Sequence, residues 1–199
     1  MHRAAAMKTM IATSYQSVSG SGSAAIAELV RQNNELGTDV ELLRDGVWSD
    51  PGVEIYARPI GWNVLPLAGD MDRDGYTVEE WKLVNETRKI LGRDDIAVEP
   101  TCVRVPTVVG HGVHASAWFD RPMDLAEANE LLAAAPGVQV WEDPVPTPLD
   151  SAGIDDVLVG RVRETTGIPG GISVWTVGDN LRKGAALNTI QIAELLVSA

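Results

Sequence analysis

The stretch TCVRVPTVVGHGVH, residues 101–114, gathers the chain's only cysteine, an arginine and two of its three histidines into one apolar run. Its β-branched residues are typical of strands. Cys102, Arg104, His111 and His114 together contain the parts of a thiol active site: a nucleophile, an anion clamp and a base. The alternative is a buried structural thiol, the usual state of a free cysteine. The stretch therefore predicts strand structure and leaves two interpretations of its sulfur.

The spacing within this stretch also predicts a bend. Arg104 and His111 are an odd number of residues apart, so an uninterrupted strand would point them to opposite faces of a sheet. Pro106 and Gly110 lie between them, and both residue types interrupt a regular pleat. If Arg104 and His111 serve one site, the chain must bend or bulge at Pro106 or Gly110.

Working outward, strand-like and helix-like runs cover most of the chain. The strand-like runs are 7–15, 101–110, 114–120, 138–143, 156–164 and 171–177, and the helix-like runs are 24–36, 77–91, 124–137 and 180–197. Helix 77–91 is marked by a capping box of Thr77 and Glu80. Residues 37–76 lack sustained periodicity and predict a long connection with short strands. Strand-to-strand steps outnumber strict alternation of strand and helix, which favours one α+β domain over residues 1–199, with a mixed, largely antiparallel sheet and helices on one face.

Composition argues against nucleic-acid and membrane partners and against stabilisation by disulfides or metal ions. A formal net charge of -12, with no lysine- or arginine-rich stripe, argues against nucleic acid. No apolar run approaches the ~20 residues that span a bilayer, which predicts a cytoplasmic protein without membrane contact. One cysteine and three histidines give neither an internal disulfide nor a cluster at zinc spacing, so no metal site is expected.

Four segments in this order resemble the aspartate-semialdehyde dehydrogenase family: SYQSVSGSG, EEWKLVNETRKIL, TCVRVPTVVGHG and DNLRKGAALNTIQIAE, with TPLDSAG and LVGRVR ahead of the last. The resemblance runs from about Ala6 to the C-terminus and covers only the family's C-terminal half. It implies the fold of the glyceraldehyde-3-phosphate-dehydrogenase-like C-terminal domain. The family's N-terminal dinucleotide-binding (Rossmann) fold, with its Gly-x-x-Gly-x-x-Gly turn, and its Asn-Cys-Ser/Thr nucleophile motif do not occur here. Because Cys102 aligns with a different cysteine of the family, we expect a structural thiol.

The resemblance implies a reaction and roles for five residues. The family reduces L-aspartyl-4-phosphate to L-aspartate 4-semialdehyde through a cysteine thioester and NADP. The resemblance matches Arg104 to the residue that clamps the substrate's α-carboxylate and His111 to the acid/base. It matches Gln16 to the residue that orients the acyl intermediate. Glu79 matches the contact to the substrate ammonium and Lys82 a phosphate contact. Without the resemblance, Arg104 reads as an internal salt bridge, His111 as a satisfied core or surface residue, and Glu79 with Lys82 as a solvated helix pair.

The resemblance further implies a cofactor site and a partner. Asn180 matches the residue that contacts the nicotinamide carboxamide, and its alternative is an ordinary helix N-cap. Ser19 and Gly20 lie in a Gly-Ser turn whose unpaired backbone amides can approach an anion. The family forms homodimers through the sheet of this half. We therefore expect substrate and phosphate binding and a homodimer, with weak or absent NADP binding.

Three hypotheses follow about what the chain does. The first is the C-terminal half of an NADP-dependent aspartate-semialdehyde dehydrogenase, serving lysine, threonine and methionine biosynthesis and inactive alone because the catalytic cysteine and dinucleotide-binding turn are missing. The second is a free-standing, non-catalytic dimerisation module derived from that family. The third is a sibling acyl-phosphate reductase, such as the one that acts on N-acetylglutamyl phosphate, whose motifs differ from TCVRVP and EEWK.

Overall fold

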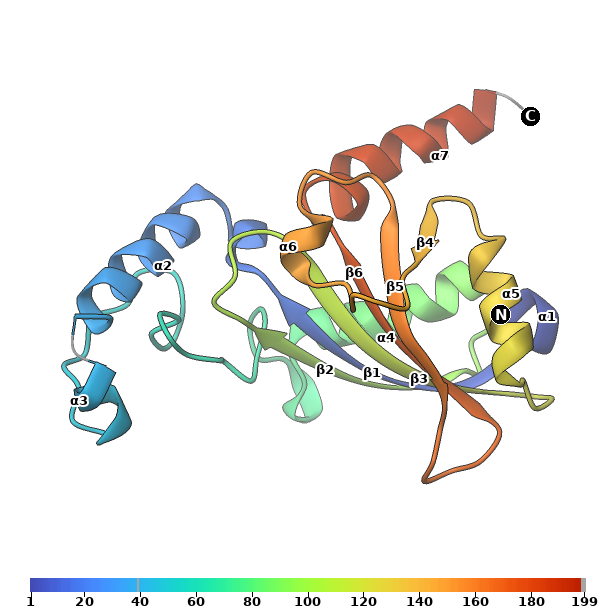
Figure 1. The fold of residues 1–199 in the computed structure, drawn as a ribbon, viewed down its shortest axis with the longest axis horizontal. Coiled ribbons are helices and arrows are strands. Elements are labelled where there is room, and N and C mark those ends of the chain that lie inside the picture. The colour runs from blue at the N-terminus through green and yellow to red at the C-terminus, as the bar shows by residue number, and fades with distance from the viewer. Residues whose placement is uncertain (39, 198–199) are drawn as a thin grey trace.

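The computed structural model describes residues 1–38 and 40–197, and its centre is a six-stranded sheet in the order β2-β1-β3-β6-β5-β4 (Figure 1). The strands are β1 (Met7–Gln16), β2 (Ala97–Arg104), β3 (His111–Phe119), β4 (Val138–Val140), β5 (Val157–Glu164) and β6 (Gly171–Gly178). The helices are α1 (His2–Ala5), α2 (Ser23–Leu36), α3 (Val40–Arg44), α4 (Val78–Leu91), α5 (Leu125–Ala133), α6 (Pro148–Ser151) and α7 (Leu187–Val197), with shorter turns η1 (Val18–Ser21), η2 (Arg73–Gly75) and η3 (Arg182–Ala186).

The pairing of the strands is mixed. β1 pairs with β2, and β4 with β5, in parallel, whereas β1–β3, β3–β6 and β5–β6 are antiparallel. Antiparallel pairs therefore prevail, as the many strand-to-strand steps in the sequence predicted. The expected α+β class with a mixed sheet is confirmed.

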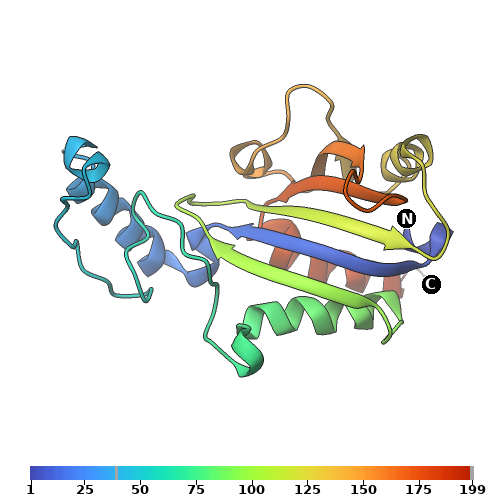
Figure 2. The ribbon, with the colours of Figure 1, turned by 90° about the horizontal axis from the view of Figure 1, so that it is seen from below.

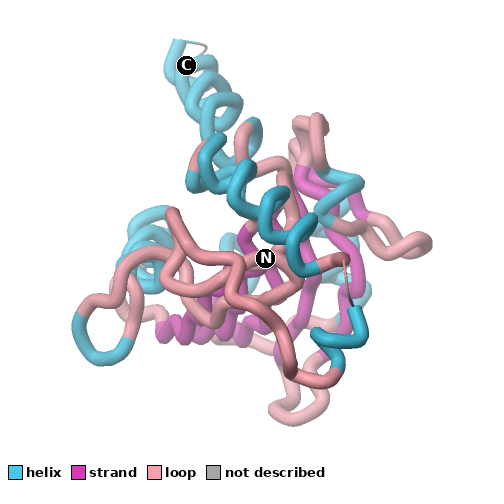
Figure 3. Tube along the Cα trace, turned by 90° about the vertical axis from the view of Figure 1, so that its left-hand side faces the viewer, coloured by secondary structure: helices cyan, strands magenta, loops and turns pink. Residues whose placement is uncertain are grey.

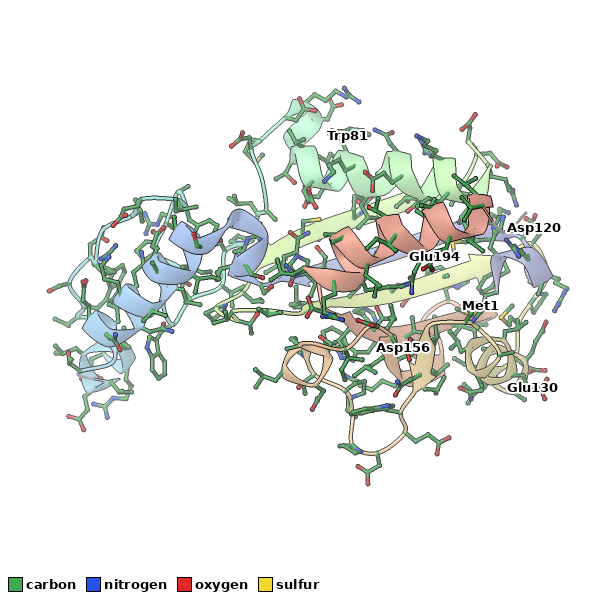
Figure 4. All side chains as sticks on the ribbon, turned by 90° about the horizontal axis from the view of Figure 1, so that it is seen from above. Met1, Trp81, Asp120, Glu130, Asp156 and Glu194 are labelled. Carbon is green, nitrogen blue, oxygen red and sulfur yellow. The ribbon has the colours of Figure 1, made fainter. Side chains whose placement is uncertain are left out.

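The two faces of the sheet differ in what covers them. Along β1, Ala12, Ser14 and Gln16 are buried, whereas Ile11 and Tyr15 on the opposite face are 44% and 36% exposed. Figure 2, seen from below, shows bare strands in front of the helices. Figure 4, seen from above, shows α4 with Trp81 and α7 with Glu194 on the other side. We call the side of Ala12 the covered face and the side of Ile11 the open face, so the prediction of helices on one face is confirmed.

The apolar core lies between α5 and the covered face. Ala128 of α5 is fully buried in one cluster with Ala117 of β3 and with Ile172 and Val174 of β6. Small alanines at the contact let the helix approach the strands closely, and each large aliphatic side chain buried there stabilises the fold by roughly 1.5–3 kcal/mol. The N-cap of α5 is Asp124, whose carboxylate accepts the Glu127 amide at 2.8 Å.

One glutamate joins α4 to the edge of the sheet. The Thr77 hydroxyl accepts the Glu80 amide at 3.2 Å and the Glu80 carboxylate accepts the Thr77 amide at 2.7 Å, which confirms the capping box. The second carboxylate oxygen of Glu80 accepts the Cys102 amide of edge strand β2 at 2.9 Å. Glu80 therefore fixes the start of α4 beside the carboxyl end of β2.

The connection over residues 37–76 differs from the prediction of short strands. It holds α3, η2 and two isolated bridges, Leu65–Arg104 and Met71–Thr77, and Figure 3 shows it mainly as loop. Two buried side chains of α2 replace strand pairing there. Glu28 accepts the amides of Glu54 and Ile55, and Gln32 accepts those of Ile60 and Gly61, all within 3.1 Å. Asp39 of this connection lies outside the described residues.

Several predicted boundaries were also wrong. Pairing with β1 from Thr9 starts β2 at Ala97 instead of 101. The run 138–143 keeps only three strand residues, helix 124–137 ends at Ala133, and the terminal helix opens with the π-helical turn η3. The short α6 was not predicted. Within residues 1–38 and 40–197, none of the helices has both the length and the apolar character to cross a bilayer.

Candidate active site

Four of the predicted site residues meet at one end of the sheet. Gln16 ends β1, Arg104 ends β2 and His111 begins β3, while Asn180 follows β6 by two residues. The register explains the meeting, because Gln16 is paired with Arg104 and His111 with Gly178. Antiparallel pairing brings the start of β3 to the ends of the other strands.

The chain bends between Arg104 and His111, as predicted. Residues 105–110 leave the strand, and Gly110 has a φ of +89°. A β-carbon at Gly110 would lie 2.4 Å from the Pro148 carbonyl oxygen, so only glycine fits there. The bend allows both side chains to reach the same site despite their odd spacing.

Ser17 is the common neighbour of these side chains. The Arg104 guanidinium donates to the Ser17 carbonyl oxygen at 2.7 Å, and the Ser17 amide donates to Nδ1 of His111 at 3.2 Å. A β-carbon at Gly20 would lie 3.7 Å from Nε2 of His111 and 3.9 Å from Nη1 of Arg104. Arg104 and His111 therefore share one site, and we call Ser17, Arg104, His111 and Asn180 the Ser17 cluster.

Arg104 is buried without an acidic partner. Its side chain belongs to a residue only 8% exposed, and none of the ion pairs among the described residues includes it. The alternative of an internal salt bridge is therefore wrong for this part of the chain. Its Nε and the Tyr56 hydroxyl are buried and have no hydrogen-bond partner among the described residues. The guanidinium carbon lies 5.7 Å from the centre of the Tyr56 ring, a cation–π contact.

A cavity of about 220 Å³ opens at this guanidinium. Arg104, Tyr56, Ser21 and Asp70 contribute polar atoms to its lining. Burying a charge without a partner is costly unless a ligand completes it. A planar guanidinium at the wall of a small cavity is suited to hold a carboxylate through two parallel hydrogen bonds.

The electrostatic surroundings keep His111 neutral. Burial, together with the nearby Arg104 charge, lowers the pKa of His111 to about 4. A backbone hydrogen bond at Gly110 and the carboxylates of Glu79 and Asp179 raise this pKa but do not offset the burial. At neutral pH the ring is therefore an uncharged imidazole that can donate at one nitrogen and accept at the other.

Asn180 faces into the cluster and is not the helix cap. Its Oδ1 accepts the Gly110 amide at 2.9 Å and the Ser17 hydroxyl at 3.1 Å, and its Nδ2 donates to the Ser19 hydroxyl at 2.9 Å. The neighbouring Asp179 accepts the amides of Leu181 and Arg182 at 2.8 and 3.1 Å. The N-cap alternative for Asn180 is therefore wrong, because Asp179 satisfies those donors.

The Gly-Ser turn also differs from its prediction. The Val18 and Ser19 amides are not unpaired, since they donate to the carbonyl oxygens of Thr107 and Val108 at 2.9 and 3.0 Å. These two bonds fasten η1 to the loop that joins β2 to β3. The turn therefore serves to place Ser17 and Gly20 beside His111, and its Ser19 amide is not available to an anion.

Glu79 and Lys82 form an exposed pair on α4. The Lys82 ammonium and the Glu79 carboxylate lie 2.9 Å apart, with side chains 53% and 35% exposed. Hydrogen bonding to Glu79 raises the pKa of Lys82. Glu79 is close enough to the Ser17 cluster to influence the pKa of His111. The pair thus lies beside the site in the geometry of a solvated helix pair.

Cys102 is not a reactive thiol in this fold. The residue is 1% exposed, and burial raises the pKa of its thiol, although a hydrogen bond with Ser14 opposes the shift. A reactive cysteine needs a depressed pKa and access. The structural interpretation of Cys102 therefore holds. Gln16, whose amide donates to Ser14 Oγ at 3.1 Å, lies buried on the same face as Cys102.

Two residues of the site were missed in the sequence. Ser17 was read only as part of a turn, and Tyr56 falls in the aperiodic connection. The serine run after Gln16 was a signal for polar contacts, but its partners are 87 to 163 residues away along the chain. Tyr56 carries no local signal, because Glu28 and Gln32 position its loop through backbone amides.

The sequence of the whole chain matches a known family. The profile described as semialdehyde dehydrogenase, dimerisation domain, matches residues 1–183. The chain belongs to the semialdehyde dehydrogenase family. Over 204 residues it is 48% identical to the aspartate-semialdehyde dehydrogenase of Mycolicibacterium smegmatis. The aligned region covers all of this chain and 58% of that relative. The chain thus spans little more than half the length of this member of the semialdehyde dehydrogenase family.

Solved structures agree with this membership. The structure of aspartate semialdehyde dehydrogenase II from Vibrio cholerae, complexed with ASA, superposes with a TM-score of 0.89 at 38% identity and covers 99% of this chain and 56% of its own. The enzyme from Candida albicans, solved with NADP, is 22% identical with a TM-score of 0.66 and covers 98% of this chain and 52% of its own. The latter shares the fold of this semialdehyde dehydrogenase domain.

Proposed function

We propose that this chain, over residues 1–199, is the substrate-binding and dimerisation domain of an NADP-dependent aspartate-semialdehyde dehydrogenase. The whole enzyme would reduce L-aspartyl-4-phosphate to L-aspartate 4-semialdehyde, a step toward lysine, threonine and methionine, in the cytoplasm. The observation that carries the proposal is the convergence of Arg104 and His111 on Ser17, together with a small cavity that Arg104 lines. Buried guanidinium and imidazole side by side suit a small anionic substrate with a reacting carbonyl.

Arg104 would hold the α-carboxylate of the substrate. Arg104 lines the cavity, and a carboxylate there would supply the charge partner that the buried arginine lacks. The Tyr56 ring lies over the guanidinium in a cation–π contact. A dry environment strengthens such a charge-assisted bond and fixes the substrate's orientation.

His111 would act as the acid/base at the oxygen of the reacting carbonyl. Its Nε2 is the ring nitrogen that faces Gly20, where the missing side chain leaves space. The family resemblance gives His111 an acid/base role and gives Gln16 the orientation of the acyl intermediate. Gln16 is paired with Arg104 across β1 and β2, so it stands at the same end of the sheet.

Glu79 and Lys82 would bind two further charged groups of the substrate. Glu79 would accept from the ammonium and Lys82 would contact phosphate. Their partial exposure leaves both groups open to a ligand, and the capped start of α4 places them beside the carboxyl end of β2. Their mutual ion pair would exchange for substrate contacts on binding.

Asn180, Ser19 and Gly20 fit the carboxamide end of a nicotinamide. Hydroxyl and amide groups supply matching donors and acceptors, and the space that a β-carbon at Gly20 would fill lies against His111. NADP, when bound, supplies the hydride. The residues of this chain would hold only that end, so we expect weak NADP binding by the chain alone.

The thiolate that attacks the acyl group would come from a segment other than this chain. The single cysteine, Cys102, is buried and structural. We expect no phosphate-dependent reduction of NADP with aspartate semialdehyde by the 199 residues alone. Adding the remaining portion of the Mycolicibacterium smegmatis relative should produce activity. Activity of the chain alone, or none from an associated complex, would contradict the proposal.

An arginine-to-lysine change tests the proposed carboxylate clamp within that complex. Arg104→Lys keeps the charge but loses the planar pair of donors. We expect kcat/KM to fall at least about tenfold, the equivalent of 1.4 kcal/mol. Arg93→Lys, on a half-buried arginine paired with Asp95 and Asp120, is the matched control and should leave kcat/KM unchanged.

The open face of the sheet would bind a second copy of the chain. Ile11 and Tyr15 are exposed there, and Tyr15 packs against Trp175 with ring centres 5.6 Å apart. Ile11→Asp should raise the dimer dissociation constant about 100-fold or more, because an unpaired carboxylate is costly to bury. Ile90→Asp, at an 80% exposed site on α4, is the control. Sedimentation that gives equal dissociation constants would exclude this face.

A free-standing dimerisation module remains the alternative outcome of these experiments. A dimer through the open face, together with failure of Arg104→Lys to alter any reconstituted activity, would support it. The acyl-phosphate reductase alternative is tested in the same assay with N-acetylglutamate semialdehyde, which we expect to be a poor substrate.

A further inference from the structure

We propose that Ser17 and Asn180 are positioning residues that hold neutral His111 with its ring proton on Nε2, so that the ring meets the substrate as a hydrogen-bond donor. The role toward substrate rests on the proposed function. The tautomer itself is a property of this chain and is measurable without substrate or cofactor.

The Ser17 amide decides which nitrogen carries the proton. It donates to Nδ1 of His111 at 3.2 Å, and the Ser17 hydroxyl oxygen lies 3.1 Å from the same nitrogen. A backbone amide has a hydrogen to donate and no acceptor orbital to offer. Nδ1 must therefore keep its lone pair, and the single ring proton of the neutral imidazole resides on Nε2.

Two other contacts hold the Ser17 amide in place. Arg104 donates to the carbonyl oxygen of Ser17 at 2.7 Å, and the Ser17 hydroxyl donates to Oδ1 of Asn180 at 3.1 Å. The Gly110 amide fixes the same Oδ1 at 2.9 Å. Ser17 is fully buried, so water does not compete for these bonds. Asn180 thereby acts on His111 through Ser17.

The surroundings of the opposite ring nitrogen differ from those of Nδ1. Nε2 lies beside Gly20 and the Arg104 guanidinium, while Glu79 and Asp179 are the carboxylates that influence the ring from α4 and from the end of β6. The adjacent guanidinium opposes a second positive charge. A neutral imidazole N–H can still polarise a carbonyl and stabilise negative charge that develops on its oxygen.

This arrangement refines the role of His111. Nε2 has no lone pair while it carries the proton, so the resting ring donates toward the substrate oxygen and does not accept there. For the ring to act as a base at Nε2, the proton would have to be on Nδ1, where it would meet the Ser17 amide.

Nitrogen NMR of the ¹⁵N-labelled chain tests the tautomer directly. Long-range proton–nitrogen spectra at pH 7 should give Nε2 the chemical shift of a protonated ring nitrogen and Nδ1 that of an unprotonated one. A coupling through the hydrogen bond should connect the Ser17 amide nitrogen with Nδ1. A ring protonated on Nδ1, or an equal mixture of tautomers, would overturn the proposal.

Matched variants test the positioning roles. Asn180→Ala and Ser17→Ala both remove the hydroxyl–amide bond and keep the Ser17 N–H, so each should lower the ratio of the two tautomers at least threefold and weaken the coupling. Thr189→Ala on α7 should leave both values unchanged. An unchanged ratio in a folded Asn180→Ala or Ser17→Ala chain would refute the positioning role, and if one variant does not fold the other decides.

The tautomer and the enzymatic proposal can fail separately. A wrong tautomer leaves the reconstitution assay unaffected, whereas inactivity of the reconstituted complex leaves the NMR assignment of His111 unchanged. The two experiments therefore distinguish an error about Ser17 and Asn180 from an error about the reaction.

Discussion

The Ser17 cluster and the Glu79–Lys82 pair lie near each other but are built in opposite ways. The cluster is buried at Ser17 and Arg104 and half-buried at His111 and Asn180, and it joins segments up to 163 residues apart through hydrogen bonds of 2.7 to 3.2 Å. The pair lies three residues apart on one helix, exposed to solvent. The difference teaches that polar contacts of similar length differ in energetic value, because burial removes the competing water.

The largest expected effect on the Ser17 cluster is the loss of stability in acid. The pKa of His111 is about 4 in the fold, below its ordinary value of 6.5, so the unfolded chain binds more protons between these pH values. Stability is therefore complete above pH 6.5 and falls as pH drops toward 4, by up to about 3 kcal/mol. Urea unfolding at fixed protein concentration measures the loss.

A neutral replacement isolates the contribution of His111. His111→Gln should remove most of the loss in the free energy of unfolding between pH 6.5 and pH 4. His114→Gln is the comparison, since His114 lies on the open face beside Arg163. Equal acid sensitivity of the wild type and His111→Gln would show that His111 titrates normally.

Removing the shared acceptor of the cluster should have the next largest effect. Asn180→Ala leaves the Gly110 amide and the Ser17 hydroxyl without their acceptor in a buried site. We expect a loss of about 2–3 kcal/mol in the free energy of unfolding. The exposed Asn188→Ala on α7 should change it by less than about 0.5 kcal/mol. Similar values for both would contradict the energetic distinction.

Glu80 sharpens the comparison within a single helix. It is adjacent to Glu79 but buried, and it accepts amides of both Thr77 and Cys102. Glu80→Ala should cost about 2 kcal/mol, the sum of a lost cap and an unsatisfied buried amide. Thermal unfolding monitored by circular dichroism measures it, and a cost below about 0.5 kcal/mol would mean that the two contacts carry no stability.

The smallest effect is expected at the exposed pair. Lys82→Ala should change the free energy of unfolding by less than about 0.5 kcal/mol, because exposed ion pairs on helices contribute little. The same variant should weaken the phosphate dependence of a reconstituted enzyme. A stability loss above about 1 kcal/mol, without any change in phosphate dependence, would contradict the proposal. It would mean that the Glu79–Lys82 pair stabilises the fold and does not bind phosphate.

Local pattern was sufficient for much of the fold. The alternation of β1, the Asp124 cap and the capping box of α4 all have short-range signals, because each depends on residues within a few positions. The same signals failed over residues 37–76. There Glu28 and Gln32 satisfy the backbone through contacts 26 to 29 residues away, which no local periodicity records.

The candidate site divides in the same manner. The motifs identified Arg104 and His111, and the odd spacing predicted the bend that Gly110 provides. The motif alignment could not indicate that Asp179, and not Asn180, accepts the amides at the start of the last helix. That choice depends on which of two adjacent polar side chains faces the helix and which faces the cluster.

The sequence alone determined the family, the strand and helix types and the residues suited to bind a small anion, because these follow from short-range pattern and side-chain chemistry. Only the tertiary structure decided that Ser17 joins Arg104, His111 and Asn180, and that Cys102 is sealed from solvent. The reason is physical: burial and hydrogen-bond direction are properties of segments brought together by the sheet, and neither is defined until the strands have paired.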